Sequence, residues 1–360
     1  MNALHTFKTI NYTKLTNSGT FTFAAPSNIA LVKYWGKKQN QIPANPSLSF
    51  TLKNCKTITK LQYQPKAEKN ISFDLLFEGQ VKESFRPKIQ KYFERIQDLC
   101  PYILDYHFKI DTQNTFPHSS GIASSASGMA ALSATIIALE KLVNPNQTEA
   151  FYLQKASLLA RLGSGSACRS IKGNIVVWGE TDSIENSSDL FGVTFPYEVN
   201  NIFNNYQDTI LLVDKGEKQV SSTVGHDLMH NHPFAERRFK QAHENIQQLK
   251  DILKTGNLTE FIALVESEAL TLHAMMMTSK PYFILMKPNT LEIINEIWKF
   301  RESTKIPVCF TLDAGANVHV LYPEKYKISV TEFITNTLAK HCQNNQFIHD
   351  EMGNGAENVS

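Results

Sequence analysis

The segment Pro117-His118-Ser119-Ser120-Gly121-Ile122-Ala123-Ser124-Ser125-Ala126-Ser127-Gly128 combines five serines with two glycines. Alternating polar and apolar residues at 106–111 predict a strand before it, and the apolar residues 129–142 predict a buried helix after it. A small-residue loop at a helix N-terminus presents backbone N–H groups to an anion. The segment therefore predicts a phosphate site, although its spacing differs from the Walker loop and no lysine follows the second glycine. The alternative is a serine-capped core helix without a ligand.

The upstream segment is an apolar strand that runs into two lysines, Ala25-Pro26-Ser27-Asn28-Ile29-Ala30-Leu31-Val32-Lys33-Tyr34-Trp35-Gly36-Lys37. Because Gly36 permits a sharp turn, Lys33 and Lys37 are predicted to face one cavity. Two cations and the Tyr34 phenol suit a pyrophosphate group. The alternative is a surface turn with solvated lysines.

Two downstream segments repeat the combination of hydroxyls and glycines. In residues 160–170, Ser164 and Ser166 alternate with glycines, and Arg169 adds a planar guanidinium that suits a carboxylate or phosphate. Residues 218–225 place Ser222 in a hydroxyl-rich loop before a predicted helix. Taken separately, the first has an ordinary explanation as a helix–helix turn and the second as a helix cap.

Asp313 follows a short apolar segment, 307–312, that predicts a buried strand. A carboxylate at a strand end, facing small residues, is suited to act as a general base. The alternative is a turn aspartate that bonds its own backbone. The histidines show no metal-ligand spacing, and the cluster at 226–232 is predicted to be a solvated helix start.

Composition limits the classes of partner and the compartment. Lys plus Arg number 36 and Asp plus Glu number 34, so the chain as a whole has little attraction for nucleic acid or an anionic membrane. The five cysteines are scattered without a C-x-x-C pair, which predicts a cytoplasmic protein with reduced thiols. The first 20 residues lack an apolar signal core, and no apolar run reaches the roughly 20 residues of a membrane span.

The order of predicted elements indicates two domains. Alternating segments at 45–52 and 57–63 and a turn at 78–80 predict antiparallel strands, and helical spacing follows at 87–99 and 148–162. A polar, turn-rich stretch that ends at residue 205 predicts the domain boundary. The expected divisions are an N-terminal extension (1–20), an N-terminal domain (21–205), a C-terminal domain (206–345) and a polar tail (346–360).

Together these segments resemble the GHMP small-molecule kinase superfamily and, within it, the diphosphomevalonate decarboxylases. The serine loop at 121–126 alone indicates only the superfamily. The decarboxylase branch is indicated by two segments together, Lys33-Tyr34-Trp35-Gly36-Lys37 and Gly163-Ser164-Gly165-Ser166-Ala167-Cys168-Arg169-Ser170. Asp313-Ala314-Gly315-x-Asn317 also matches, and the matching segments occur in the family's order over most of residues 24–322.

The resemblance implies a two-domain α+β fold of the GHMP-kinase type. The N-terminal domain is then similar to ribosomal protein S5 domain 2 and carries the ATP phosphate loop, and the C-terminal domain is ferredoxin-like. The implied reaction is the ATP- and Mg²⁺-dependent phosphorylation of the 3-hydroxyl of (R)-5-diphosphomevalonate, followed by loss of phosphate and CO₂ to give isopentenyl diphosphate. The resemblance also implies a homodimer.

Residue roles follow from the same resemblance. Asp313 is the implied base at the 3-hydroxyl, Lys37 helps to position the reacting oxygen, and Asn28 orients Arg169. The residues implied to bind the substrate are Lys33, Tyr34, Lys37, Ser164, Ser166, Arg169 and Ser222. Those implied to bind the ATP phosphates are Ser119, Ser120, Gly121, Ala123, Ser124, Ser125 and Ser127, with Ser124 and Ser125 also contacting Mg²⁺.

The chain departs from the family pattern at Thr223 and His226, where some members carry an arginine and many a methionine. The preference for a diphosphate over a monophosphate therefore stays open, and a phosphomevalonate decarboxylase or a mevalonate 3-kinase is the nearest alternative. The presence of Asp313, Arg169 and Lys37 together favours full decarboxylation. A non-catalytic nucleotide- or metabolite-binding protein on the same fold is the second alternative.

Overall fold

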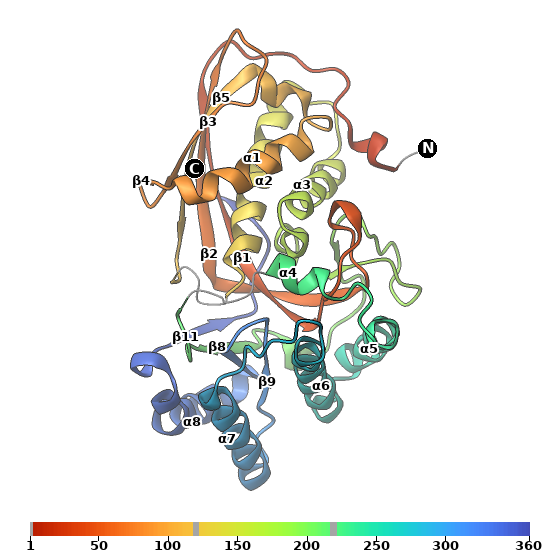
Figure 1. Cartoon of the computed structure of the whole chain (residues 1–360), viewed down its shortest axis with the longest axis vertical. Helices are drawn as coiled ribbons and strands as arrows, with labels where there is room; N and C mark the ends of the chain where they lie inside the picture. Colours follow the sequence, from red (N-terminus) through yellow and green to blue (C-terminus); the bar gives the residue numbers. More distant parts are fainter. Residues whose placement is uncertain (1–2, 118–121, 217–221) are drawn as a thin grey trace.

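The computed structural model describes residues 3–117, 122–216 and 222–360, and in this part of the chain it shows two domains (Figure 1). The N-terminal domain forms the upper half of the view in Figure 1, and the C-terminal domain forms the lower half. Ser119, Ser120 and Gly121 of the predicted phosphate loop lie outside the described residues, and so does the side chain of Ser222.

The N-terminal domain is built on a mostly antiparallel sheet whose two longest strands are adjacent. Their register runs from Gly19 opposite Tyr63 to Val32 opposite Leu48, and it shifts at Pro26, which has no N–H to donate. The strands in spatial order are β12 (Glu357–Asn358), β1 (Gly19–Val32), β2 (Ser47–Pro65), β5 (Tyr106–Asn114), β3 (Phe73–Phe77) and β4 (Gln80–Val81), with β6 (Ile175–Trp178) between β2 and β7 (Val193–Thr194).

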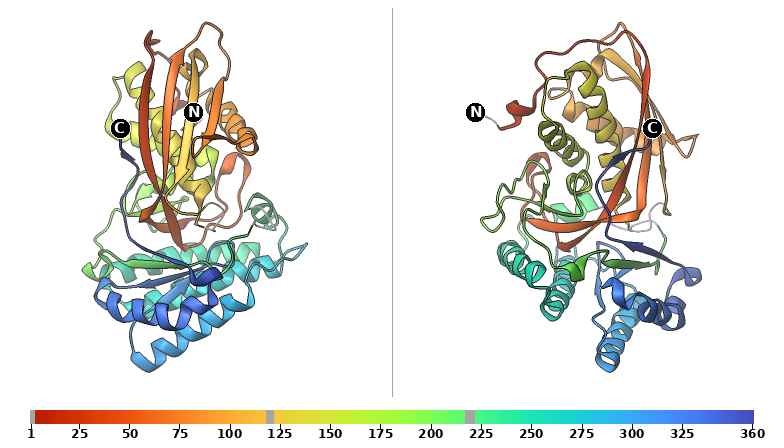
Figure 2. Two further views of the ribbon diagram at one scale, coloured as in Figure 1. Left: turned by 90° about the vertical axis from the view of Figure 1, so that its left-hand side faces the viewer. Right: turned by 180° about the vertical axis from the view of Figure 1, so that it is seen from behind.

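Three helices cover one face of this sheet, as Figures 1 and 2 show. They are α1 (Arg86–Ile96), α2 (Ser124–Val143) and α3 (Glu149–Gly163). The cap predicted at the start of α3 is confirmed, because Thr148 Oγ1 accepts a hydrogen bond from the Phe151 N–H at 3.1 Å. Contrary to the sequence expectation, α2 is long and apolar enough to cross a membrane, but most of it is buried as the core helix of this domain.

The C-terminal domain contains a four-stranded antiparallel sheet and most of the remaining helices. The strands in spatial order are β11 (Phe347–Glu351), β8 (Gln207–Leu211), β10 (Val318–Tyr322) and β9 (Cys309–Thr311). The helices are α4 (Ser222–Asp227), α5 (Ala235–Thr255), α6 (Leu258–Met277), α7 (Pro288–Thr304) and α8 (Lys327–Phe333). Figure 1 places α4 between the two domains and α6 directly below it.

One hydrophobic cluster crosses the boundary between the domains. It contains Ile29 and Phe50 from the ends of β1 and β2, together with Ile210, Val265 and other residues of the C-terminal domain, and all four named side chains are buried. The two domains also have separate clusters of their own. The end of β1, which carries the predicted lysine segment, is therefore fixed against both domains.

Residues 346–360 were predicted to be a polar tail, and this was wrong. β11 pairs along the whole of β8, and β12 pairs with β1, so the chain returns to the N-terminal domain (Figure 2). The strands predicted at 45–52 and 57–63 are parts of one continuous strand, β2. The predicted N-terminal extension contains a short 3₁₀ turn, Ala3–Phe7, and packs on the domain through Phe7 and Thr9, which are buried.

Candidate active site

Lys33 and Asp313 meet at the boundary between the domains. Lys33 directly follows β1, and Asp313 follows β9 in the C-terminal domain. The Lys33 ammonium donates a hydrogen bond to Asp313 Oδ1 at 3.1 Å. The Lys33 side chain is buried, whereas the Asp313 side chain keeps 31% of its surface exposed. A substrate can therefore reach the carboxylate but not the buried stem of the lysine.

The electrostatic surroundings of Lys33 favour proton release. Burial lowers the pKa of Lys33, and the charge of Arg169 acts in the same direction, while Asp313 and Glu268 partly offset the effect. The ammonium is therefore held by its carboxylate partner against a large desolvation cost. An added anion beside Lys33 would favour the charged form further.

Arg169 is buried, and its hydrogen-bond partners among the described residues are neutral groups. Its Nη1 donates to Ser47 Oγ at 2.6 Å, and its Nε donates to Ser49 Oγ at 2.9 Å and to Asn28 Oδ1 at 3.3 Å. Among the described residues, no carboxylate lies within ion-pair distance of this guanidinium. A buried cation without a counter-ion is costly, so its retention here points to an anionic ligand.

Asn28 connects Arg169 to the serine-glycine segment. Its Nδ2 donates to the Ser166 carbonyl at 3.2 Å and to Ser170 Oγ at 2.8 Å, while its Oδ1 accepts from Arg169. These bonds fix the amide orientation and thereby the guanidinium. The side chains of Ser164 and Ser166 are half-buried beside them. The arrangement agrees with the predicted role of Asn28 in orienting Arg169.

Tyr34 packs against Gly165 of the serine-glycine segment and against His226 of α4. Its ring packs at 4.6 Å from the Trp178 ring and at 4.2 Å from the His226 ring, measured between centroids. A Cβ at Gly165 would stand 3.0 Å from the Tyr34 hydroxyl, so glycine is needed for this close approach. Burial raises the pKa of Tyr34, which keeps the phenol neutral as a hydrogen-bond donor.

The Arg169 guanidinium is electrostatically coupled to the same groups. Burial lowers the pKa of Arg169, and the Cys168 thiol, the Asp313 carboxylate and the Tyr34 phenol act in the opposite direction. Lys33, Asp313, Arg169 and Tyr34 thus influence one another across the domain boundary. The predicted residues from three separate segments form one site.

Lys37 lies beside a different carboxylate from Lys33, and the prediction that both lysines face one cavity stays a prediction. Its ammonium lies 3.6 Å from Asp227 Oδ1 at the end of α4, and its side chain is 15% exposed. The intervening turn is sharp, as predicted, because Gly36 has φ +97°. The turn directs the second lysine toward α4 instead of toward Asp313. The lysine next to the predicted base is therefore Lys33.

His226 is buried and not solvated, which corrects the prediction for this histidine. Its ring packs at a tilt against Trp35, 4.7 Å between centroids, and its Nδ1 accepts a hydrogen bond from the Gly36 N–H at 3.0 Å. Burial, together with the charges of Lys37 and Arg169, lowers the pKa of His226 to about 3. A neutral imidazole therefore fastens α4 to the segment that carries both lysines.

The described end of the predicted phosphate loop opens onto the N-terminus of α2. Ala123 adopts a left-handed conformation, φ +43°, which is uncommon for a residue with a Cβ, and no described side chain caps the helix. Ser124 and Ser125 occupy the first turn. The uncapped end of this long buried helix retains backbone donors and a positive dipole end for an anion.

Ser127 does not face this opening. Its side chain is fully buried, and its hydroxyl lies 2.6 Å from Thr57 Oγ1. The hydroxyl of Ser125 accepts a hydrogen bond from the Lys88 ammonium at 2.7 Å. The geometry therefore argues against the predicted phosphate contact of Ser127, and it gives the Ser125 hydroxyl a cationic partner in Lys88.

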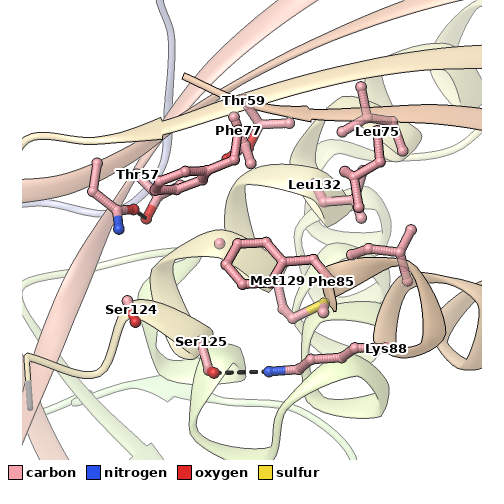
Figure 3. Close-up of a pocket in the computed structure, with 15 residues that line it drawn as sticks. Thr57, Thr59, Leu75, Phe77, Phe85, Lys88, Ser124, Ser125, Met129 and Leu132 are labelled. Carbon is pink, nitrogen blue, oxygen red and sulfur yellow. Dashed lines mark hydrogen bonds between the residues drawn. The ribbon is translucent and has the colours of Figure 1, made fainter. Parts of the chain in front are cut away.

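A cavity of about 210 Å³ lies beside the first turn of α2 (Figure 3). Its walls are mainly apolar, with a few hydroxyls and one ammonium. Figure 3 shows Ser124 and Ser125 at one end and Phe77, Phe85 and Met129 nearer the middle. The lining residues are Thr57, Thr59, Leu75, Phe77, Phe85, Lys88, Ile89, Ile110, Thr112, Asn114, Ser124, Ser125, Gly128, Met129 and Leu132.

The residues present fit a magnesium ion that is held mostly by phosphate oxygens. Among the described residues, no group of three or more His, Cys, Asp or Glu side chains can hold a metal ion. Mg²⁺ commonly keeps several waters and binds through substrate phosphates with few protein ligands. The Ser124 hydroxyl in the first turn of α2 is an oxygen ligand of this kind.

The sequence did not indicate the residues that fix the backbone of Lys33 and the orientation of Arg169. Glu268 of α6 accepts the Lys33 backbone N–H at 2.8 Å and is paired with Arg238 of α5 at 2.6 Å. Ser47, Ser49 and the aromatic face of Trp178 were also missed. In a sequence, a buried charged residue of an amphipathic helix cannot be distinguished from a charged residue on its solvent-exposed face. No local pattern therefore identifies Glu268 or Arg238.

Comparison with known proteins gives matches over nearly the whole chain. Residues 25–189 match the family model described as the diphosphomevalonate decarboxylase-like N-terminal domain, and residues 209–359 match the mevalonate 5-diphosphate decarboxylase C-terminal domain. The diphosphomevalonate decarboxylase of Ganoderma lucidum is 29% identical over 332 residues, which cover 87% of this chain and 80% of the relative.

Two further similarities concern ligands and substrate. A solved structure of MDDEF in complex with MVAPP, AMPPCP and magnesium superimposes with a TM-score of 0.81 at 28% identity, and the match covers 96% of this chain and all of that one. The phosphomevalonate decarboxylase of Haloferax volcanii is 25% identical over 310 residues, which cover 85% of this chain and 89% of the relative. The two-domain α+β fold predicted from the sequence is confirmed.

Proposed function

Because this chain belongs to the diphosphomevalonate decarboxylase family, we propose that it decarboxylates (R)-5-diphosphomevalonate with ATP. The products are isopentenyl diphosphate, ADP, phosphate and CO₂. The observation that carries the proposal is the Lys33–Asp313 pair, at 3.1 Å, which is electrostatically coupled to a buried arginine that has no carboxylate partner among the described residues. One site thus offers a base, a cation beside it, and a fixed cation for an anionic substrate.

We assign the base role to Asp313. Its carboxylate accepts the proton of the substrate 3-hydroxyl, and that oxygen bonds to the γ-phosphorus of ATP as the bond to ADP breaks. The C3–O bond then breaks with its electrons on the departing phosphate. The electrons of the bond to the carboxylate form the new C=C bond as CO₂ leaves. Lys33 is placed to stabilise charge at the reacting oxygen.

Arg169 and its partners are proposed to hold the substrate. The guanidinium, fixed by Ser47, Ser49 and Asn28, presents its remaining N–H groups to the substrate's anionic end. The Tyr34 phenol is electrostatically coupled to this guanidinium, and Lys37, Ser164, Ser166 and Ser222 are kept as predicted contacts of the substrate. This arrangement neutralises charge without adding water, which suits loss of a carboxylate.

The nucleotide is proposed to bind along the N-terminus of α2. The apolar cavity in Figure 3 accepts the adenosine, and the uncapped helix end with Ala123 and Ser124 accepts the phosphates. Mg²⁺, when bound, neutralises charge on the transferred phosphoryl group, with Ser124 as its protein ligand. The solved structure of a relative in complex with AMPPCP and magnesium supports the choice of ATP and Mg²⁺ as ligands.

A cytoplasmic location and a homodimer are also proposed. The location is supported by the five cysteines, which are all within the described residues and are all buried free thiols. The homodimer rests on the family resemblance. Sedimentation velocity tests it, because a dimer sediments with twice the mass of the 360-residue chain.

The decisive experiment measures CO₂ release with ATP and Mg²⁺ for wild type, Asp313→Asn and the control Asp214→Asn. Asp214 is a more exposed aspartate, 3.8 Å from Lys287. We expect CO₂ from 5-diphosphomevalonate only, a loss of at least about 1,000-fold in kcat for Asp313→Asn, and little change for Asp214→Asn. Nucleotide binding should survive in both variants.

The same experiment tests the alternatives, with 5-phosphomevalonate and mevalonate supplied in parallel. Release of CO₂ from the monophosphate instead would move the chain to the activity named for the Haloferax volcanii relative. A phosphorylated product without CO₂ would indicate a mevalonate 3-kinase. Nucleotide binding without turnover of any of the three would favour a non-catalytic binding protein.

A further inference from the structure

We propose that His273, a buried histidine of α6, is a positioning residue that fixes the loop carrying Asp313. This inference rests on the proposed role of Asp313 as the base. His273 Nε2 lies 3.1 Å from the backbone carbonyl oxygen of Asp313, and only 1% of the residue is exposed. Its hydrogen bond is to the backbone carbonyl, so it acts through the main chain of the base.

Helix α6 also fixes the main chain of Lys33, which is the partner of Asp313 in the ion pair. Glu268, five residues before His273 on α6, accepts the backbone N–H of Lys33 at 2.8 Å. Arg238 of α5 donates to the Lys33 carbonyl at 3.0 Å and to both carboxylate oxygens of Glu268. The main chains of Lys33 and Asp313, which belong to different domains, are therefore both fastened to α6.

The loop after β9 has hydrogen-bonded anchors at both ends and open space around its glycine. Its residues are small, and a Cβ built on Gly315 would meet nothing within 4 Å. Its far end is anchored, because Thr290 Oγ1 donates to the Ala316 carbonyl at 2.7 Å and Asn317 Oδ1 accepts the Asp214 N–H at 2.9 Å. His273 supplies the anchor at the near end, directly at Asp313.

The chemistry of the imidazole suits this task. To bond a carbonyl oxygen, Nε2 must carry the proton, so the ring must be the Nε2–H tautomer or the imidazolium. Burial and the charge of Lys33 lower the pKa of His273 to about 4. The hydrogen bond to the Asp313 carbonyl and the charge of the Asp313 carboxylate act in the opposite direction and offset part of this effect. The neutral tautomer therefore holds the loop without adding a second cation beside Lys33.

A base must stay within hydrogen-bond reach of the proton that it accepts, and a displacement of about 1 Å can cost about 100-fold in rate. Loss of the hydrogen bond between His273 and the Asp313 carbonyl is therefore expected to slow the chemical step. Substrate and nucleotide binding, which use Arg169 and α2, should change little. This difference separates positioning from a general loss of structure.

The test compares His273→Leu with His273→Gln, alongside wild type and Asp313→Asn. We expect His273→Leu to lower kcat and the single-turnover rate of ADP formation about 100-fold, with the KM for either substrate within about threefold. His273→Gln should recover to within about fivefold of wild type, because its amide N–H can replace Nε2–H. Hydrogen exchange at residues 313–317, measured by mass spectrometry, should rise in His273→Leu only.

His232→Leu is the matched control. His232 is also a buried histidine whose Nε2 lies 3.1 Å from a backbone carbonyl of α6, that of Met275. Its loss should lower the melting temperature about as much as His273→Leu while keeping kcat within about threefold. A wild-type kcat in His273→Leu, failure of His273→Gln to rescue, or an equal loss of kcat in the control would each overturn the inference.

The outcomes separate this inference from the proposed function. If wild type releases CO₂ and Asp313→Asn does not, the base assignment stands, and an active His273→Leu overturns only the role of His273. If wild type is inactive with all substrates, hydrogen exchange still decides the point. Unchanged exchange at 313–317 in His273→Leu would show that the histidine does not hold the loop.

Discussion

Lys33 and Lys37 are the same chemical group, four residues apart, in opposite environments. The first is buried against Asp313 and the second faces Asp227 near the surface. Desolvation strengthens the interaction of a buried cation with developing negative charge, whereas a more exposed cation is screened by water. The two lysines should therefore contribute to different steps.

We expect Lys33→Met to lower kcat for CO₂ release about 100-fold with a small change in KM. Lys37→Met should mainly raise the KM for 5-diphosphomevalonate, about tenfold, because it removes a charge from the substrate site and not from the base. Steady-state kinetics of both variants check this. A larger loss of kcat in Lys37→Met than in Lys33→Met would return the catalytic role to Lys37.

The sequence indicated the candidate site residues but not the residues that fix their backbone. Asp313, Arg169 and Asn28 stand in short segments whose spacing and resemblance are visible locally. Glu268 lies 235 residues from Lys33, whose N–H it accepts, and nothing in its own helix distinguishes it from a solvated glutamate. The direction of Lys37 was missed because the turn at Gly36 sets it.

At the scale of elements, α2 and α3 are joined by a buried ion pair. Lys155 of α3 donates to Glu140 of α2 at 2.7 Å, to Thr9 at 2.7 Å and to the Leu99 carbonyl at 3.0 Å. Tyr102 donates to the second oxygen of Glu140 at 3.0 Å. The network satisfies all three ammonium protons and fastens the N-terminal segment to both helices.

Glu140→Gln is expected to destabilise the protein by about 3 to 5 kcal/mol, because it leaves the Lys155 charge buried without a counter-ion. Glu149→Gln is the matched control. It breaks the Lys141–Glu149 pair between the same two helices, which is exposed and should cost less than about 1 kcal/mol. Urea unfolding measures both changes. Equal costs would mean that burial of the pair does not matter.

Elements with local signals were predicted well, and the continuity of β2 was not. The Thr148 cap and the turn at residues 78–80 follow from neighbouring residues. Between the two alternating halves of β2, residues 53–56 break the pattern. They stay in the strand because the Asp350 carboxylate of β11 accepts the N–H groups of Lys53, Asn54 and Cys55. That contact comes from almost 300 residues away along the chain.

At the scale of the whole molecule, two domains with separate cores share a third one at their boundary. His226 and His273 lie along this boundary, and both must be neutral in the folded protein. Their ordinary pKa of about 6.5 applies once the chain unfolds. The sequence indicated two domains but not the shared core, because its residues are contributed by strands and helices far apart in the chain.

The folded protein should lose stability as the pH falls below about 6.5. Between that value and the lowered pKa values, about 3 for His226 and about 4 for His273, the unfolded chain binds more protons than the folded one. Each histidine then costs about 2 kcal/mol between pH 7 and 5. His226→Met should reduce this loss, as measured by urea unfolding at both pH values. An unchanged pH dependence would mean that His226 is not buried as described.

The shared cluster also bears on how such enzymes can be recombined. A chimera that joins residues 1–205 of this chain to the second half of a relative 29% identical would bring together two sets of side chains shaped by different partners. The join would lie in a surface loop, yet the mismatch would lie in the interior. Exchange of halves between lineages is thus restricted by packing, and the two halves must evolve as one unit.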